Sequence, residues 1–203
     1  MDAEGARRAT GAATDGAALC NATMVNFTAV SNDTQVPRTT VYEYFRILED
    51  TLLLHELPAW RESKTRRPIV SSKYYFFDVG VVGSLQGREA QPGTPEYGAA
   101  VETLLLHELR SYVDYRSGEP LRYWRSASGY EVDFLLGDHT AIEVKAKPTI
   151  AAQDLRSLRA LADEKRFKRL VCVGLHARPR RVEKIEVVPL SHFLEALWAG
   201  EYR

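Results

Sequence analysis

Apolar residues recur at three- and four-residue steps over residues 41–52, which predicts an amphipathic helix. A shorter helix is expected before it, beginning near Asn26, whose side chain can cap a first turn. Residues 52–60 and 73–78 have the apolar and aromatic composition that strands favour. Two short helices followed by extended segments predict a small winged-helix-like unit, which we place over residues 23–88.

A stretch rich in turn-forming residues separates this unit from the rest of the chain, and we place a domain boundary within it, at residues 86–95. Downstream the pattern predicts, in order, helix 96–115, strands 121–124, 130–136 and 140–147, helix 153–167, strands 170–175 and 185–190, and helix 191–198. The first of these helices is expected to bury an apolar face formed by Val101, Leu104, Leu105 and Leu109. This order predicts an α/β domain over residues 95–203, with a mixed sheet flanked by helices. Residues 1–22 are small and weakly patterned, and a flexible N-terminal tail is expected there.

Composition narrows the class of protein. The 203 residues are 45% hydrophobic, and 27 basic residues balance 27 acidic ones, so the formal net charge is zero. This composition excludes disorder as the dominant state, and it favours local patches over a generally basic surface for any contact with nucleic acid. Two cysteines do not make a disulfide framework. With no long apolar run, signal peptide or P-loop motif in the sequence, a cytoplasmic protein without membrane spans is expected, and not a nucleotide hydrolase by itself.

Three charged residues on the two arms of a predicted hairpin form the strongest chemical pattern. Asp133 lies in the first arm, and Glu143 and Lys145 lie in the second. Because side chains alternate along a strand, folding can bring all three to one face. Carboxylate oxygens are the ligands that Mg²⁺ prefers, and Mn²⁺ is a second candidate cofactor. A bound metal would activate water, while Lys145 would orient or deprotonate that water and stabilise negative charge on a phosphate.

Other acidic residues extend the pattern. Glu102, on the preceding predicted helix, is the expected third metal ligand, and Glu108 is the second candidate, although it is expected to face solvent. Glu131 shares the face of Asp133 and is expected at the rim of the site. The competing interpretation is a salt-bridge ladder across the surface of a hairpin, which is common and stabilises little.

Asp133, followed nine residues later by Glu143-Val144-Lys145, resembles the motif of the PD-(D/E)xK nuclease superfamily, although Val132 stands where that motif has proline. Three segments, NFTAVSNDTQVPRTTVYEYFRILEDTLLLHELPAW, KYYFFDVGVVGSL and YWRSASGYEVDFLLGDHTAIEVKAK, resemble the domain of unknown function at the C-terminus of bacterial and archaeal AAA+ class ATPases. In that family an ATPase module comes first, then a winged-helix-like segment and a nuclease-like domain. This sequence contains no P-loop motif, which is compatible with a fragment, a split gene or a stand-alone remnant. The resemblance implies a restriction-endonuclease-like fold, a DNA-directed role and an AAA+ ATPase module or subunit as a partner. It carries metal-binding positions onto Glu102, Asp133 and Glu143, and the basic position onto Lys145.

Candidate contacts with DNA lie outside this motif. They are the residues that open the second predicted helix and an aromatic–basic pair at the end of a strand: Arg38, Thr39, Thr40, Tyr42, Trp124 and Arg125. For Trp124 a place in the core is the stronger expectation. Basic runs over residues 61–67 and 178–181 are further candidates for phosphate contact, or are simply solvated loops.

Three functions are therefore compatible with the sequence. The first is a magnesium-dependent deoxyribonuclease that hydrolyses phosphodiesters. The second is a non-catalytic nuclease-fold module that docks DNA or an AAA+ ATPase. The third is an ATPase regulator with no affinity for nucleic acid.

Overall fold

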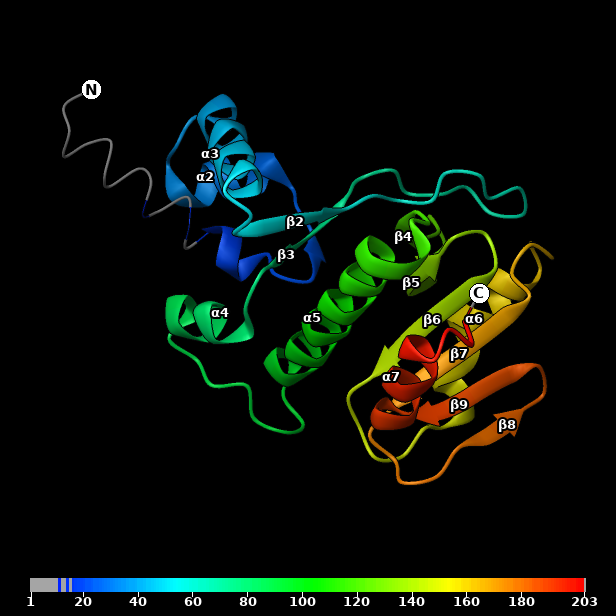
Figure 1. The fold of residues 1–203 in the computed structure, drawn as a ribbon. Helices are drawn as coiled ribbons and strands as arrows, with labels where there is room; N and C mark the ends of the chain where they lie inside the picture. Colours follow the sequence, from blue (N-terminus) through cyan, green and yellow to red (C-terminus); the bar gives the residue numbers. More distant parts are fainter. Residues whose placement is uncertain (1–10, 12–13, 15, 203) are drawn as a thin grey trace. The chain divides into compact units, whose positions relative to one another are not determined.

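The computed structural model describes residues 11, 14 and 16–202, which form two compact units (Figure 1). The N-terminal unit contains the described residues up to Leu57 together with Ser71–Ala90. The C-terminal unit contains Pro58–Val70 and the residues from Gln91 onward. The segment that connects two strands of the first unit, residues 58–70, thus folds with the second.

The N-terminal unit combines short helices with a small antiparallel sheet. Its elements are β1 (Thr23–Met24), α2 (Phe27–Thr34), α3 (Arg38–Asp50), β2 (Leu54–Leu57), β3 (Lys73–Phe76) and α4 (Val79–Gln86). The strands are ordered β1-β3-β2. As predicted, Asn26 caps α2, because its side-chain oxygen accepts hydrogen bonds from the backbone N–H groups of Thr28 and Ala29. In this unit the helices α2 and α3 are followed by the antiparallel strands β2 and β3.

Part of the predicted tail is folded. Residues 16–19 are helical, and the side chains of Ala17 and Ala18 are buried in the same cluster as Val30, Val41 and Phe45. A flexible tail is therefore wrong for residues 16–22, because methyl-sized side chains let this segment approach the apolar core closely. The earlier part of the predicted tail lies outside the described residues, apart from residues 11 and 14.

The glycines after residue 78 do not prevent a helix. Asp78 begins α4, because its Oδ1 accepts a hydrogen bond of 2.9 Å from the N–H of Val81. Gly87, at a φ of 61°, ends the helix in the left-handed conformation that glycine adopts without strain. The segment from Gly87 to the next helix is the predicted linker, and the boundary between the two units lies within it, after Ala90.

The C-terminal unit is built on a six-stranded mixed sheet, which confirms the predicted α/β class. Its strands are β4 (Leu121–Arg125), β5 (Glu131–Leu136), β6 (Thr140–Lys145), β7 (Arg169–Gly174), β8 (Arg180–Val182) and β9 (Ile185–Pro189). They are ordered β4-β5-β6-β7-β9-β8, and β6, β7 and β9 are parallel. The short, mostly exposed β8 was not predicted, because its three residues, Arg-Arg-Val, carry no strand periodicity.

Helices flank this sheet, as predicted: α5 (Pro95–Tyr112), α6 (Arg156–Ala162) and α7 (Leu190–Trp198). A π-type turn extends α5 to Ser117, and a 3₁₀ turn, Ala152–Leu155, leads into α6. Leu105, Leu106 and Leu109 of α5 are buried, whereas Leu104, predicted on the same face, is 44% exposed. The apolar face of α5 is thus the predicted one, with Leu106 buried in place of Leu104.

Residues 58–70, which we call the strap, complete the edge of this sheet. Trp60 donates its backbone N–H to the carbonyl of Tyr123 at 2.7 Å, and Ile69 donates to the carbonyl of Arg125 at 2.8 Å. Both ends of the strap therefore bond to β4, whose outer edge would otherwise be open. The indole of Trp60 is 1% exposed and belongs to the main apolar cluster of this unit.

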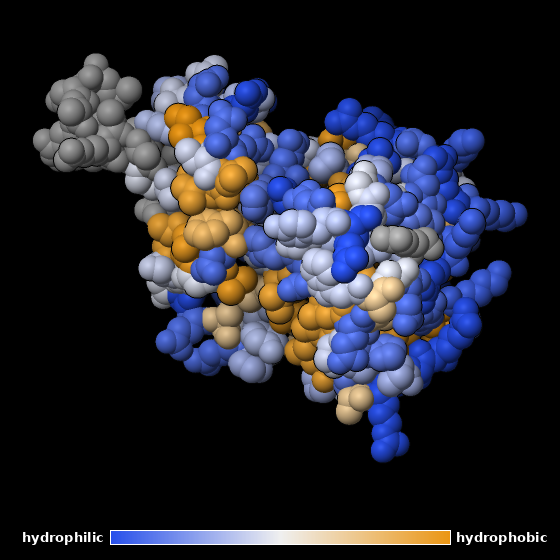
Figure 2. All heavy atoms as spheres, in the orientation of Figure 1, coloured by the Kyte–Doolittle hydropathy of each residue, from blue (hydrophilic) through white to orange (hydrophobic). Residues whose placement is uncertain are grey.

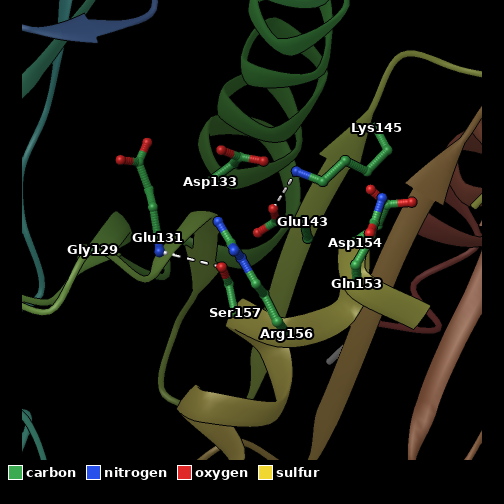
Figure 3. Close-up of a pocket in the computed structure, with 9 residues that line it drawn as sticks. All are labelled: Gly129, Glu131, Asp133, Glu143, Lys145, Gln153, Asp154, Arg156 and Ser157. Atoms are coloured by element: carbon green, nitrogen blue, oxygen red, sulfur yellow. Dashed lines mark hydrogen bonds and ion pairs between the residues drawn. The ribbon is translucent and has the colours of Figure 1, made fainter. Parts of the chain in front are cut away.

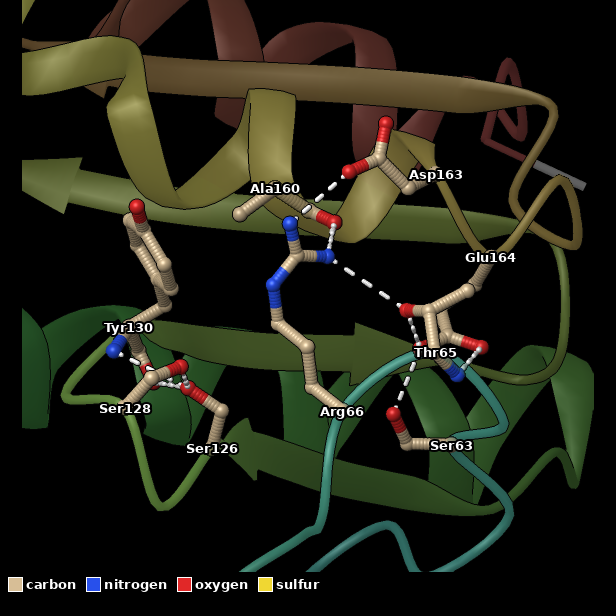
Figure 4. A network of polar contacts seen from close by, with 9 residues as sticks. All are labelled: Ser63, Thr65, Arg66, Ser126, Ser128, Tyr130, Ala160, Asp163 and Glu164. Atoms are coloured by element: carbon tan, nitrogen blue, oxygen red, sulfur yellow. Dashed lines mark hydrogen bonds and ion pairs between the residues drawn. The ribbon is translucent and has the colours of Figure 1, made fainter.

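The middle of the strap is held by polar contacts with the end of α6 and the residues after it (Figure 4). The carboxylate of Glu164 accepts hydrogen bonds from the Ser63 hydroxyl, the Lys64 N–H, and both the N–H and hydroxyl of Thr65. Arg66 donates to the carbonyl of Ala160 at 2.7 Å and pairs with Asp163 at 2.8 Å. Arg66 is thus engaged within the protein, which argues against its predicted place in a free phosphate patch.

Several large apolar side chains of the N-terminal unit lie at its surface. The most exposed are Leu52 at 68%, Leu19 at 66% and Ile47 at 53%. Figure 2 shows apolar side chains gathered on the visible face of this unit, whereas hydrophilic residues cover much of the rest of the view. Within residues 11, 14 and 16–202, no helix is both long and apolar enough to cross a bilayer.

Candidate functional site

Strands β5 and β6 separate at the point where the predicted motif lies. Their paired residues run from Leu136 and Thr140 to Phe134 and Ile142, and the ladder stops there. Beyond this point the Asp133 side chain takes the place of a backbone acceptor, because its Oδ2 accepts the N–H of Val144 at 2.8 Å. A buried carboxylate, 7% exposed, is thereby fixed where the sheet opens.

Glu143 and Lys145 meet on the neighbouring strand. The ammonium of Lys145 donates to Oε1 of Glu143, whereas Oε2 of Glu143 is buried without a hydrogen-bond partner in the described part of the chain. Burial, then repulsion from Asp133, raises the pKa of Glu143 well above its usual range, despite attraction from Lys145. Burial alone would lower the pKa of Lys145, but the charges of Glu143 and Asp133 outweigh it and raise that pKa. Lys145 is therefore an ammonium at neutral pH.

A polar pocket of about 470 Å³ lies in front of these residues (Figure 3). Its lining comes from the turn before β5, from β5 and β6, and from the start of α6: Gly129, Glu131, Asp133, Glu143, Lys145, Gln153, Asp154, Arg156 and Ser157. In Figure 3 the strand residues and the helix residues face each other across it. The structure thus brings the three central residues of the motif, Asp133, Glu143 and Lys145, into one pocket.

The donor set suits a hard divalent cation. Oε2 of Glu143 is buried without a partner among the described residues, and the pKa of the Glu143 carboxyl is raised, so the site lacks positive charge. Asp133 adds a second carboxylate. Among the described residues, no three carboxylate, histidine or cysteine side chains already form a metal-binding group. Two carboxylates nevertheless suffice for Mg²⁺, which commonly fills its remaining positions with water and substrate phosphate.

The other predicted acidic residues have separate places. Glu102 on α5 does not line the pocket, but it lies near enough for its charge to contribute to the raised pKa of Glu143. Glu108 is engaged elsewhere, since its Oε2 accepts the indole N–H of Trp198 at 2.8 Å. Glu131 lines the pocket and pairs with Arg125 at 2.7 Å, which fits a place at the rim.

The predicted DNA contacts divide into two groups. Arg38, Thr39 and Tyr42 are exposed and Thr40 is half-buried, all in the first turns of α3. Trp124 is completely buried in the main apolar cluster of the C-terminal unit, which confirms the stronger expectation of a place in the core and leaves its ring unable to stack on a base. Arg125 is committed to its ion pair with Glu131.

Sequence reasoning missed the helix side of the pocket, formed by Gln153, Asp154, Arg156 and Ser157. The signal that could have found them is topological. They begin the crossover that follows the strand of Glu143 and Lys145, and residues just past the carboxyl end of a parallel strand commonly line a ligand site. No hydrophobic period or charge pattern distinguishes them in the sequence.

Glu143→Gln is expected to stabilise the metal-free protein at neutral pH by about 1 kcal/mol, as substitutions of strained site residues often do. The folded state raises the pKa of Glu143, so this group favours folding only while it is protonated, and that contribution is lost as pH rises through its folded-state pKa. The advantage of the variant should therefore be small in acid and grow toward neutral pH. Urea unfolding of both proteins across this pH range measures it, and an advantage that shrinks with rising pH contradicts the prediction.

Two known families resemble parts of this chain. Residues 97–193 match a domain of unknown function, DUF4143, and residues 7–92 match another, DUF8612. No curated protein matches the chain. The DUF8612 match ends at residue 92, inside the linker between α4 and α5, and the DUF4143 match begins at residue 97, in the first turn of α5. The DUF4143 match contains Asp133, Glu143 and Lys145. The chain is thus similar, in its two parts, to two families whose descriptions assign no activity.

Proposed function

We propose that the C-terminal unit hydrolyses phosphodiester bonds of DNA with the help of a divalent cation. The observation that carries this proposal is the opening between β5 and β6, where Asp133, Glu143 and Lys145 face one polar pocket and Glu143 Oε2 is buried without a partner. A surface salt-bridge ladder, the competing interpretation, does not account for it, because Asp133 and Glu143 are 7% and 4% exposed.

Each residue has a definite task in this proposal. Asp133 and Glu143 would hold Mg²⁺ or Mn²⁺, with Glu102 lending further negative charge. When bound, the ion would lower the pKa of a coordinated water and neutralise charge on the phosphate. The raised pKa of Lys145 excludes it as the base in the metal-free state, so its ammonium serves to orient water and to stabilise negative charge on the phosphate oxygens. Hydrolysis would then form a bond from the water oxygen to phosphorus and break the bond to the leaving oxygen; the attacking water releases its proton to solvent, and the leaving oxygen takes up a proton from solvent.

A second candidate function is docking to an AAA+ ATPase without catalysis. DUF4143 is associated with the C-terminal regions of such ATPases, which makes an ATPase partner plausible. The exposed apolar side chains of the N-terminal unit, and the zero net charge of the chain, also suit a protein partner. In this case DNA or ATPase binding should survive substitution of Asp133 and Lys145.

Calorimetric titration with Mg²⁺ and Mn²⁺ tests the proposed site. The wild type should bind one ion, and Glu143→Ala should lose at least about tenfold in affinity, since it removes one of two carboxylate ligands. Glu108→Gln is the matched control, because Glu108 is an acidic residue of α5 bonded to Trp198 and should leave the affinity unchanged. Because such ions also bind substrate phosphate, the titration is repeated with a DNA duplex present. Equal affinities for wild type and Glu143→Ala in both series would refute the metal site.

A further inference from the structure

Most charged side chains that line the pocket are already committed to partners within the protein. Glu131 pairs with Arg125 at 2.7 Å, Lys145 pairs with Glu143, and Asp154 pairs with Lys147 at 2.7 Å. Asp133 accepts the N–H of Val144. These contacts fix the walls of the pocket and leave their charges partly neutralised.

Arg156 differs from these residues. Its side chain is exposed, and its guanidinium makes no hydrogen bond or ion pair with any part of the chain that the structure describes. Figure 3 shows the side chain extending from the start of α6 toward the strands that bear Asp133 and Glu143. By contrast, Arg159, one turn further along α6, is bound to both carboxylate oxygens of Glu183 and to the carbonyl of Ala152. The guanidinium of Arg156 is thus available to a ligand in the pocket.

The negative charge of the pocket makes the available guanidinium of Arg156 important for binding an anion. Four carboxylates line it, those of Glu131, Asp133, Glu143 and Asp154, against two cationic side chains, Lys145 and Arg156. A phosphate entering such a pocket would be repelled unless cations met it. One of the three ammonium donors of Lys145 goes to Glu143, and the charge of that carboxylate partly offsets the charge of Lys145. All the guanidinium donors of Arg156 remain available, and the planar guanidinium can bind two phosphate oxygens at once.

We propose that Arg156 is the phosphate-binding residue of this pocket, and that it holds a backbone phosphate of a DNA substrate beside the Asp133–Glu143 pair. This inference rests on the proposed function. It assigns the binding and positioning of substrate to the start of α6, which faces the strands that bear Asp133 and Glu143. Ser157 supports the geometry, because its buried hydroxyl accepts the backbone N–H of Glu131 at 3.4 Å and ties the start of α6 to β5. Arg156 is a binding residue, so its loss weakens capture of the substrate more than the chemical step.

The first test is binding of a fluorescently labelled DNA duplex, followed by anisotropy in EDTA over a series of salt concentrations. Arg156→Gln should bind about five- to tenfold more weakly than wild type, and the slope of log affinity against log salt should fall by about one. Arg156→Lys, which keeps the charge but not the two-pronged geometry, should fall between them. Lys168→Gln is the matched control: Lys168 is exposed, lies outside the pocket and outside the basic runs at residues 61–67 and 178–181, and its substitution removes the same charge.

The second test is steady-state cleavage with Mg²⁺, in which Arg156→Gln should raise KM about five- to tenfold and leave kcat within about twofold. If the duplex binds only when metal is present, the comparison of KM values replaces the anisotropy measurement as the test of Arg156. If the wild type binds and cleaves DNA but Arg156→Gln and Lys168→Gln match it in KM and salt slope, the role of Arg156 is refuted while the nuclease function stands. If the wild type neither binds nor cleaves DNA, both fail together.

Discussion

Asp133→Asn should abolish DNA cleavage, lowering the rate by about a thousandfold or more, as expected when a group that stabilises transition-state charge is lost. The substitution removes the negative charge that would hold the cation, yet the amide oxygen of asparagine can still accept the N–H of Val144. The strands should therefore stay joined at the same place and the fold should persist. Cleavage of a labelled duplex with Mg²⁺ or Mn²⁺, alongside thermal unfolding, measures both properties.

Lys145→Met provides an independent variant at the same site. It keeps the apolar stem of the side chain and removes the ammonium that pairs with Glu143, so cleavage should again be lost. Glu108→Gln should cleave as the wild type does, because Glu108 bonds to Trp198 and does not line the pocket. Wild-type cleavage by both Asp133→Asn and Lys145→Met would show that any nuclease activity resides elsewhere.

Trp124→Ala should destabilise the protein by about 3–5 kcal/mol, the usual cost of removing a large aromatic side chain from a core. Trp124 is completely buried among the side chains of the main apolar cluster, including Val132, Leu135 and Leu158. Its indole N–H is buried without a hydrogen-bond partner among the described residues, so removing that group alone should cost little. Urea unfolding gives the free-energy difference.

Trp124→Phe separates packing from the possible stacking of a base. It keeps an aromatic ring, removes the unpaired N–H, and should cost less than about 2 kcal/mol. Its affinity for DNA should equal that of the wild type, because a fully buried ring does not contact the nucleic acid. A stable Trp124→Phe protein with clearly weakened DNA binding would restore the role that the sequence suggested for this residue.

The α/β class and the central motif could be predicted because they depend on local patterns. Ile142 and Val144 alternate with Glu143 and Lys145, and this alternation places a charged pair on one face of a strand whatever the rest of the chain does. The opening between β5 and β6 could not be predicted in the same way. It depends on the Asp133 side chain replacing a backbone acceptor for the N–H of Val144. That contact forms only once the two strands are paired, so the sequence pattern does not show it.

Other errors have equally specific causes. Leu104 belongs to the run Leu104-Leu105-Leu106, in which two neighbours compete for the buried face of α5, and the pattern alone does not decide which is exposed. Ala17 and Ala18 contribute little to a hydrophobic pattern, yet their small size lets them enter the core. Arg156 looks like any charged residue at the start of a helix, and only the location of the pocket distinguishes it.

The strap has a consequence for how this protein can be divided or recombined. A cut at the linker would look natural, since one family match ends there and the other begins just after it, but the cut would separate Trp60 from the unit in which it is buried. The polypeptide passes between the two units three times, because residues 58–70 depart from one and return to it. The six-stranded unit is therefore encoded by two separated stretches of sequence. A gene fusion that transfers only the downstream stretch would produce a sheet whose β4 edge is uncovered. A recombinant protein that contains the six-stranded unit must therefore also contain the strap, or another segment that covers the edge of β4.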